Sequence, residues 1–158
     1  MRIEQLMARP VQYCGPEDTL ARAAQLMWDH DCGCVPVCTG DGIARVVSVI
    51  TDRDICMSAL FQGKPLQDIR VSDAMAKRLL TCSPNDSVGA AERKMREARI
   101  RRLPVVDKEG TLVGMVSLAD LAQEAAREQA ARRKEITESE VGDTLAAICE
   151  PLHRQLAA

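Results

Sequence analysis

Two short motifs pair a hydroxyl group with a carboxylate three residues later. Thr51 and Asp54 follow the apolar stretch "VVSVI", and Ser117 and Asp120 follow "LVGMV". Each pair lies where an expected strand passes directly into an expected helix, so its two side chains would share one helix face. Helix N-termini attract anions. These two corners, Thr51–Asp54 and Ser117–Asp120, can therefore bind the phosphate and the ribose diol of a nucleotide.

The same residues also have an explanation that needs no ligand. A Ser or Thr immediately before a helix caps its first backbone N–H groups. An Asp in the first turn is favoured by the helix dipole in any protein. Residue type and spacing thus leave helix capping and ligand binding open at both corners.

The elements that position the corners come from an internal repeat. Shifting the sequence by 68 residues superposes Met7 on Met75 and Cys14 on Cys82. After a two-residue insertion in the first copy the offset becomes 66, which places the two corners on each other. A repeat of this length indicates two copies of one structural unit.

Each copy predicts the same order of elements, β-α-β-β-α. A short helical segment and a brief extended piece come first, and Asp18 and Asp86 are expected to cap the helices that follow. Two strands joined by a glycine turn then lead into a second helix, which in the first copy ends at Gly63. We therefore expect an α/β (α+β) fold with copies at 1–65 and 66–125 and a helical extension at 126–158.

Composition limits the possible ligands and partners. Apolar residues make up 46 % of the chain but aromatic residues only 2 %, so aliphatic side chains must hold any base. A net charge of −2 gives no electrostatic footprint for nucleic acid. No apolar run approaches the ~20 residues that a membrane span needs, and the N-terminus lacks the apolar centre of a signal peptide. We expect a cytoplasmic protein with no membrane partner.

With the repeated pattern "hPVV…G/S-x-x-T/S-x-x-D", residues 1 to about 125 resemble a tandem pair of cystathionine β-synthase (CBS) domains. The "TDRDI" ending of the first copy is similar to small stand-alone bacterial CBS proteins of the hypoxic-response type. The resemblance implies a pseudo-twofold tandem and a regulatory, non-catalytic role. It also implies adenosine-containing ligands (AMP, ATP, NAD or S-adenosylmethionine) in clefts between the copies, with no required cofactor. As partners, the resemblance implies a second copy, in a homodimer formed through the helices, and an effector protein of unknown identity.

The resemblance assigns roles to the corner residues. Asp54 and Asp120 would hold ribose hydroxyls, while Thr51 and Ser117 would lie beside the phosphates. Apolar residues on the neighbouring strands would line the slot for the base: Val35, Val37, Leu103 and Val105.

The resemblance also covers residues around the corners. Gly114 would let the backbone approach the ligand, and the first copy departs from the pattern with Ser48 at that position. Arg101 and Arg102 would meet phosphates, whereas the matching positions 33 and 34 carry no charge. The two sites should therefore differ in their demand for phosphate. Arg53 can serve the first site, pair with its acidic neighbour or face solvent.

The cysteines raise alternatives to nucleotide binding, and a set of catalytic residues would raise another. The chain has seven cysteines, and "CGCVPVC" suggests a metal or redox site, although its spacing does not match a Cys-x₂-Cys zinc knuckle. We expect no metal site, because Cys14 and Cys82 are repeat partners of the buried, hydrophobic kind. No catalytic constellation is present, so we expect no enzyme. A structural or dimerisation module with empty clefts and a thiol or metal sensor remain the alternatives.

A second helix is predicted in the extension. Thr137 and Glu140 have the spacing of a capping box. An apolar stripe follows at Val141, Leu145, Ile148 and Cys149. This helix either covers the core or packs on a partner chain.

Overall fold

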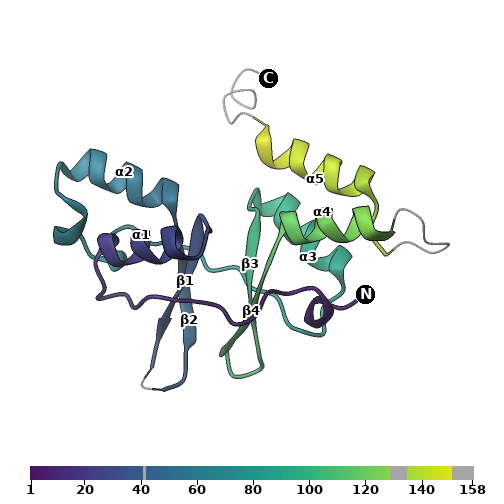
Figure 1. Cartoon of the computed structure of the whole chain (residues 1–158), viewed down its shortest axis with the longest axis horizontal. Helices are drawn as coiled ribbons and strands as arrows, with labels where there is room; N and C mark the ends of the chain where they lie inside the picture. Colours follow the sequence, from purple (N-terminus) through teal and green to yellow (C-terminus); the bar gives the residue numbers. More distant parts are fainter. Residues whose placement is uncertain (41, 129–134, 151–158) are drawn as a thin grey trace. The chain divides into compact units, whose positions relative to one another are not determined.

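The computed structural model describes residues 1–40, 42–128 and 135–150, and these group into two compact units. The first-copy unit comprises Pro10–Thr81 together with Val106–Val113. The second-copy unit comprises Met1–Arg9, Cys82–Val105 and the described residues from Gly114 onward. Figure 1 shows the elements of both units along the chain.

The first-copy unit is a β-hairpin with two helices beside it (Figure 1). Its strands β1 (Cys34–Thr39) and β2 (Arg45–Thr51) pair antiparallel, with Val35 opposite Ile50. A single parallel bridge between Cys14 and Val37 adds the expected extended piece. The helical elements are α1 (Leu20–Asp29), α2 (Asp52–Gln62), and the 3₁₀ turns η2 (Leu66–Asp68) and η3 (Val71–Asp73).

The second-copy unit repeats this plan. Strands β3 (Arg102–Val106) and β4 (Leu112–Ser117) form a hairpin of which residues 102–105 and 114–117 belong to this unit. Cys82 bridges Val105 in parallel, as Cys14 bridges Val37. Its helical elements are η1 (Ile3–Gln5), α3 (Val88–Ala98), α4 (Leu118–Arg127) and α5 (Glu138–Cys149). The mixed α/β fold and the order of elements predicted from the repeat are confirmed.

The two repeats exchange their first helical segments. The N–H of Ile3, from the start of the first copy, donates to the carbonyl of Asp86 at 3.0 Å. The N–H of Val71, its repeat partner, donates to the carbonyl of Asp18 at 2.8 Å. Ile3 and Val71 are both fully buried, so each compact unit takes part of its core from the other stretch of sequence.

The residues that cap α1 and α3 lie one position later than predicted. Thr19 Oγ1 accepts from the N–H of Arg22, and Ser87 Oγ accepts from the N–H of Ala90, both at 3.2 Å. The Asp18 carboxylate instead accepts from the N–H of Gly15 three residues earlier, and Asp86 does the same with Ser83. Asp18 and Asp86 therefore close the turns before the helices and do not cap them, because a Thr or Ser already occupies the capping position.

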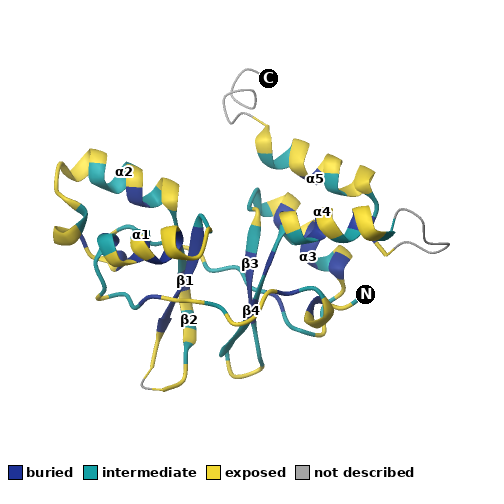
Figure 2. Ribbon diagram, in the orientation of Figure 1, coloured by how far each residue is buried: buried dark blue, intermediate teal, exposed yellow. Residues whose placement is uncertain are grey.

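Strand β1 is buried from Cys34 to Cys38. Helix α2 buries only Ile55, and Figure 2 shows most of it exposed. It ends at Gly63 as expected, where the backbone is left-handed with φ 62°. Among the described residues, no helix is long and apolar enough to cross a membrane.

Helix α5 begins with the predicted capping box, in which the Thr137 N–H donates to Glu140 Oε2 at 2.7 Å. It packs on α3 and α4 of its own unit and so covers part of the core, as the first of the two alternatives expects (Figure 1). The expected stripe is wrong in detail, because Thr144 is the buried residue and Leu145 is 45 % exposed. The rest of the predicted extension, 129–134 and 151–158, lies outside the described residues.

Candidate functional site

The first-copy corner is a closed ring of hydrogen bonds at the start of α2. The backbone N–H and the hydroxyl of Thr51 both donate to Asp54 Oδ2, at 2.9 and 2.7 Å. The N–H of Asp54 donates back to Thr51 Oγ1 at 3.2 Å. Both residues are half-buried, so the corner remains accessible from solvent.

The second-copy corner has the same geometry at the start of α4. The N–H and hydroxyl of Ser117 donate to Asp120 Oδ2, at 2.8 and 2.6 Å. The N–H of Asp120 donates to Ser117 Oγ at 3.3 Å. Each corner is thus a capping box in which the shorter Asp takes the place of the usual Glu or Gln.

Capping therefore occurs at both corners, and it uses only part of each carboxylate. In the described part of the chain, all recorded bonds reach Oδ2, and none reaches Oδ1 of Asp54 or Asp120. A carboxylate has about four acceptor sites. The capped Asp can accordingly still accept two hydroxyl groups of a vicinal diol, and its orientation is fixed in advance by the cap.

Gly114 has a packing role inside the second-copy unit. A Cβ at this position would lie 2.3 Å from Met7 Sδ, closer than real contacts allow. In the first-copy unit, Ser48 at the matching position is buried, and its hydroxyl donates to the carbonyl of Ala76 at 2.6 Å. The departure at Ser48 is thus accommodated by a local hydrogen bond, while the ligand role of Gly114 stays a prediction.

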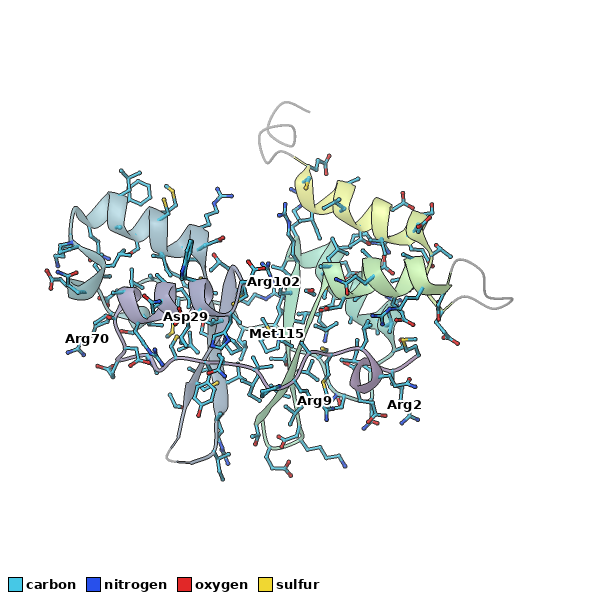
Figure 3. The ribbon with its side chains drawn as sticks, viewed as in Figure 1. Arg2, Arg9, Asp29, Arg70, Arg102 and Met115 are labelled. Atoms are coloured by element: carbon cyan, nitrogen blue, oxygen red, sulfur yellow. The ribbon has the colours of Figure 1, made fainter. Side chains whose placement is uncertain are left out.

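The basic residues of the second copy lie close to the start of α4. The carbonyl of Arg101 accepts from the N–H of Leu118 at 2.8 Å, which ties the residue before β3 to that helix start. The exposed Arg101 guanidinium reaches Cys149 Sγ on α5 at 3.4 Å. Arg102, labelled in Figure 3, is half-buried as the first residue of β3. The Arg101 backbone therefore lies at the start of α4, while its guanidinium extends to α5.

The first-copy corner is more acidic. The carbonyl of Gly33 accepts from the N–H of Asp52 at 3.3 Å, the counterpart of the Arg101–Leu118 bond. Asp52 Oδ1 accepts from the backbone N–H of Arg53 at 2.7 Å, and Arg53 is exposed. The first copy was expected to be less positive because its positions 33 and 34 are uncharged where the second copy has Arg101 and Arg102. The Asp52 carboxylate increases this difference in charge between the two sites.

The residues predicted to line a base slot are core residues within their units. Val35, Val37, Leu103 and Val105 are each at most 1 % exposed. The first pair packs in the core of the first-copy unit and the second pair in that of the second-copy unit. Contact between these side chains and a base stays a prediction.

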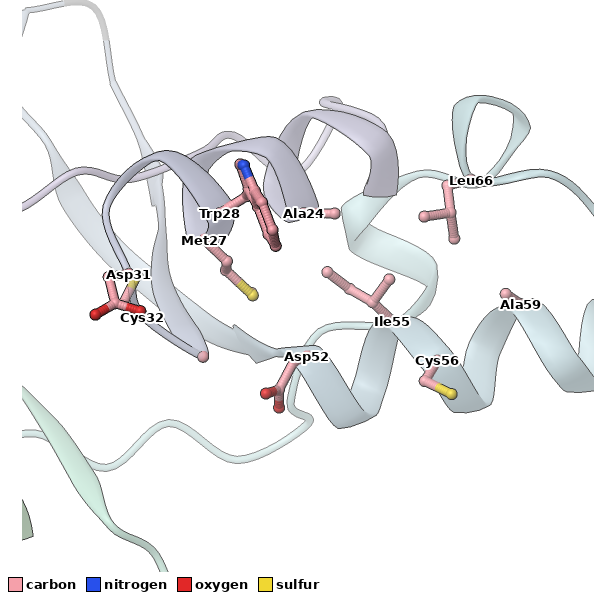
Figure 4. Close-up of a pocket in the computed structure, with 11 residues that line it drawn as sticks. Ala24, Met27, Trp28, Asp31, Cys32, Asp52, Ile55, Cys56, Ala59 and Leu66 are labelled. Carbon is pink, nitrogen blue, oxygen red and sulfur yellow. The ribbon is translucent and has the colours of Figure 1, made fainter.

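One groove was missed by the sequence reasoning. It lies between α1 and α2 of the first-copy unit and has a volume of about 720 Å³ (Figure 4). Trp28 lines it with 84 % of its surface exposed, which is unusual for a large apolar side chain. A lone Trp on the exposed side of helix α1 was the signal that could have revealed the groove.

The cysteines are thiols in the structure, and three of them are poorly reactive. Burial raises the pKa of Cys14 and of Cys82 to about 12, and that of Cys38 to about 11. Such thiols are protonated at neutral pH and serve as small hydrophobic residues. Within residues 1–40, 42–128 and 135–150, no group of three His, Cys, Asp or Glu side chains is placed to hold a metal ion.

Comparison with known proteins gives consistent matches to both copies. A model of the CBS domain family matches residues 3–60 and 71–127. The CBS domain-containing protein YhcV of Bacillus subtilis is 38 % identical over 120 residues, covering 76 % of this chain and 82 % of the relative.

Two solved structures are similar over most of their length. The first is hypoxic response protein I with two coordinated zinc ions, which is 32 % identical with a TM-score of 0.69 over 78 % of this chain and 98 % of that one. The second is the CBS domain protein PAE2072 of Pyrobaculum aerophilum complexed with AMP. It is 29 % identical, with a TM-score of 0.72 over 80 % of this chain and 94 % of that one.

Proposed function

This chain belongs to the CBS domain family, and from that premise we propose that it is a regulatory module that binds an adenosine-containing nucleotide. The observation that carries the proposal is the pair of capped carboxylates, Asp54 and Asp120, each with one oxygen left to accept hydrogen bonds. The AMP complex of a similar CBS protein supports the choice of ligand class.

Each residue has a defined task in the proposed site. Asp54 and Asp120 accept the two ribose hydroxyls, and the helix starts at Thr51 and Ser117 provide N–H groups for a phosphate. Arg101 and Arg102 bind phosphate oxygens, since a guanidinium fork matches them in geometry and charge. Aliphatic residues hold the base, since only 2 % of the residues are aromatic.

The module acts by differential affinity. A nucleotide that prefers one conformation shifts the population toward it, and an effector protein that distinguishes the conformations receives the signal. No catalytic step is required. All seven cysteines are thiols, which suits a reducing cytoplasm.

Thermal unfolding with AMP, ATP, NAD and S-adenosylmethionine tests the proposal. At 100 times its Kd a ligand adds about 2.7 kcal/mol, which raises the Tm of a chain of this size by roughly 5–10 °C. Asp120→Asn keeps an oxygen for the capping box but replaces the remaining acceptor by an amide. We expect the ligand-dependent rise to shrink while the Tm of the free protein stays within a few degrees.

The capping box of α5 provides a matched control. Glu140→Gln makes the same chemical change in a box at which no ligand is proposed, so the response to ligand should persist. If none of the four ligands raises the Tm, the sensor proposal fails. If a ligand raises it equally in Asp54→Asn, Asp120→Asn and the unmodified protein, binding occurs but not at the corners.

We also propose that the protein forms a homodimer through the end of α2. Leu60 and Phe61 are 69 % and 78 % exposed there, and a second copy would remove them from water. Light scattering should give the molar mass of a dimer for the unmodified protein. The Leu60→Ser, Phe61→Ser double variant should give the molar mass of a monomer. A monomer before substitution refutes this assembly.

A further inference from the structure

The exposed guanidinium of Arg101 is held by the end of helix α5. Its Nη2 donates to Cys149 Sγ at 3.4 Å, and Cys149 is the last residue of the helix. A second contact lies beside the first, because Arg99 Nη2 pairs with the Glu150 carboxylate at 3.0 Å. All four residues belong to the second-copy unit. Two arginines before β3 therefore fasten the end of α5 to the chain.

The two contacts differ in strength. Arg99 has a partner of opposite charge, whereas the sulfur that receives the Arg101 hydrogen bond is only a weak acceptor. In the described part of the chain, no ion pair with Arg101 is recorded. The Arg101 guanidinium is therefore positioned by α5 without being neutralised by it.

The backbone of Arg101 lies beside the second-copy corner. Its carbonyl accepts from the N–H of Leu118, the first residue of α4, and Leu118 directly follows Ser117 of the corner. The Arg101 side chain is exposed, so no packing opposes a change to another staggered rotamer. The same guanidinium is thus placed between two acceptors, the thiol on α5 and a phosphate at the corner.

We propose that the phosphate of a nucleotide in the second-copy corner takes Arg101 away from Cys149 and so releases the last turn of α5. A guanidinium–phosphate contact joins two charged groups, commonly through two parallel hydrogen bonds, and is stronger than a single bond to a thiol. Phosphate therefore wins the competition. A nucleoside without phosphate leaves α5 in place. This inference rests on the proposed function and adds a signal that only a phosphorylated ligand produces.

The release is confined to the end of the helix. The Thr144 hydroxyl donates to the buried Glu92 carboxylate near the middle of α5, and this contact does not involve Arg101. At the end, only the partly exposed pair of Arg99 and Glu150 remains among the recorded contacts of the described residues, and such pairs contribute little. The last carbonyls of a helix also lack intrahelical partners, so this turn opens most readily.

Hydrogen exchange measured by mass spectrometry on the full-length protein tests the release. Saturating AMP should raise the exchange rate of the amides in 145–150 at least about twofold, whereas saturating adenosine should not. Ligand binding ordinarily stabilises a fold and slows exchange, so a rise limited to this segment is specific. In Arg101→Ala the rate should be high without ligand, and AMP should raise it no further.

Linkage supplies the reciprocal test, because a contact that competes with phosphate weakens phosphate binding. Cys149→Asp gives Arg101 a carboxylate partner on α5. It should weaken AMP binding roughly two- to fivefold in calorimetry, with the affinity for adenosine unchanged. All proteins in this series carry Asp54→Asn, so that the titration reports on the second-copy corner.

Two matched variants serve as controls. Glu150→Gln removes the neighbouring contact to Arg99 and should not weaken AMP binding. Gln67→Glu adds the same negative charge as Cys149→Asp, at an exposed residue of the first-copy unit, and should leave the affinity for AMP unchanged.

The outcomes separate this inference from the proposed function. If AMP neither binds in calorimetry nor raises the Tm, both fail. If AMP binds and exchange in 145–150 does not rise, or rises equally with adenosine, the release of α5 alone fails, and this arm needs no variant to fold. Equal weakening of AMP and adenosine binding by Cys149→Asp also overturns the inference, because the substitution then acts without regard to phosphate.

Discussion

Thr144→Val tests what holds α5 on its unit. Thr144 is fully buried, and its hydroxyl donates to Glu92 Oε1 across the α3–α5 contact. Glu92 is only 6 % exposed, so no water can readily replace the lost donor. Val has the shape of Thr and leaves no cavity. The expected cost is therefore that of one hydrogen bond to a carboxylate in a buried site, about 2 kcal/mol within a range of 1.5–3.

The assay is a double-mutant cycle measured by urea and thermal unfolding. A loss of about 2 kcal/mol lowers the Tm of a chain of this size by roughly 4–8 °C. In a Glu92→Leu background the hydroxyl has no carboxylate to bind, so Thr144→Val should cost less than about 0.5 kcal/mol. An equal cost in both backgrounds, or a cost near zero in the unmodified protein, would refute the role given to this hydrogen bond.

The remaining predictions concern thiols and glycines. Iodoacetamide at pH 8 should label the exposed Cys56 while Cys14 and Cys82 stay unlabelled by mass spectrometry, because burial raises their pKa to about 12; labelling of all three at one rate contradicts this. Because the unfolded thiols ionise near their ordinary pKa of 9.0, these two residues stabilise the fold fully below pH 9 and progressively less as the pH rises toward 12. The loss is measured as a falling Tm. Gly114→Ala should cost about 1–3 kcal/mol in urea unfolding, because its Cβ would lie within 2.3 Å of a methionine side chain. Gly142 lies inside α5 with open space around it, so Gly142→Ala should raise the free energy of unfolding by about 0.5–1 kcal/mol. A lower free energy of unfolding in this variant would contradict the described packing of α5.

Local features were predictable because the residues that cause them are close in the sequence. The capping boxes at Thr51, Ser117 and Thr137 depend on one side chain and a partner three positions away. The strand pairs follow from apolar stretches joined by glycine turns. The prediction failed by one residue at Asp18, because Asp and the following Thr are both good capping residues and only the backbone path selects between them.

The amino-acid sequence alone established the duplication, the β-α-β-β-α order and the hydroxyl–carboxylate corners, since all three depend on spacing along the chain. The tertiary structure decided that Ile3 and Val71 change places between the units, that α5 buries Thr144 against Glu92, and that a groove opens between α1 and α2 beside Asp31. These choices depend on which surfaces far apart in the chain exclude water together. Periodicity marks a face as apolar, but it does not identify the surface that will cover it.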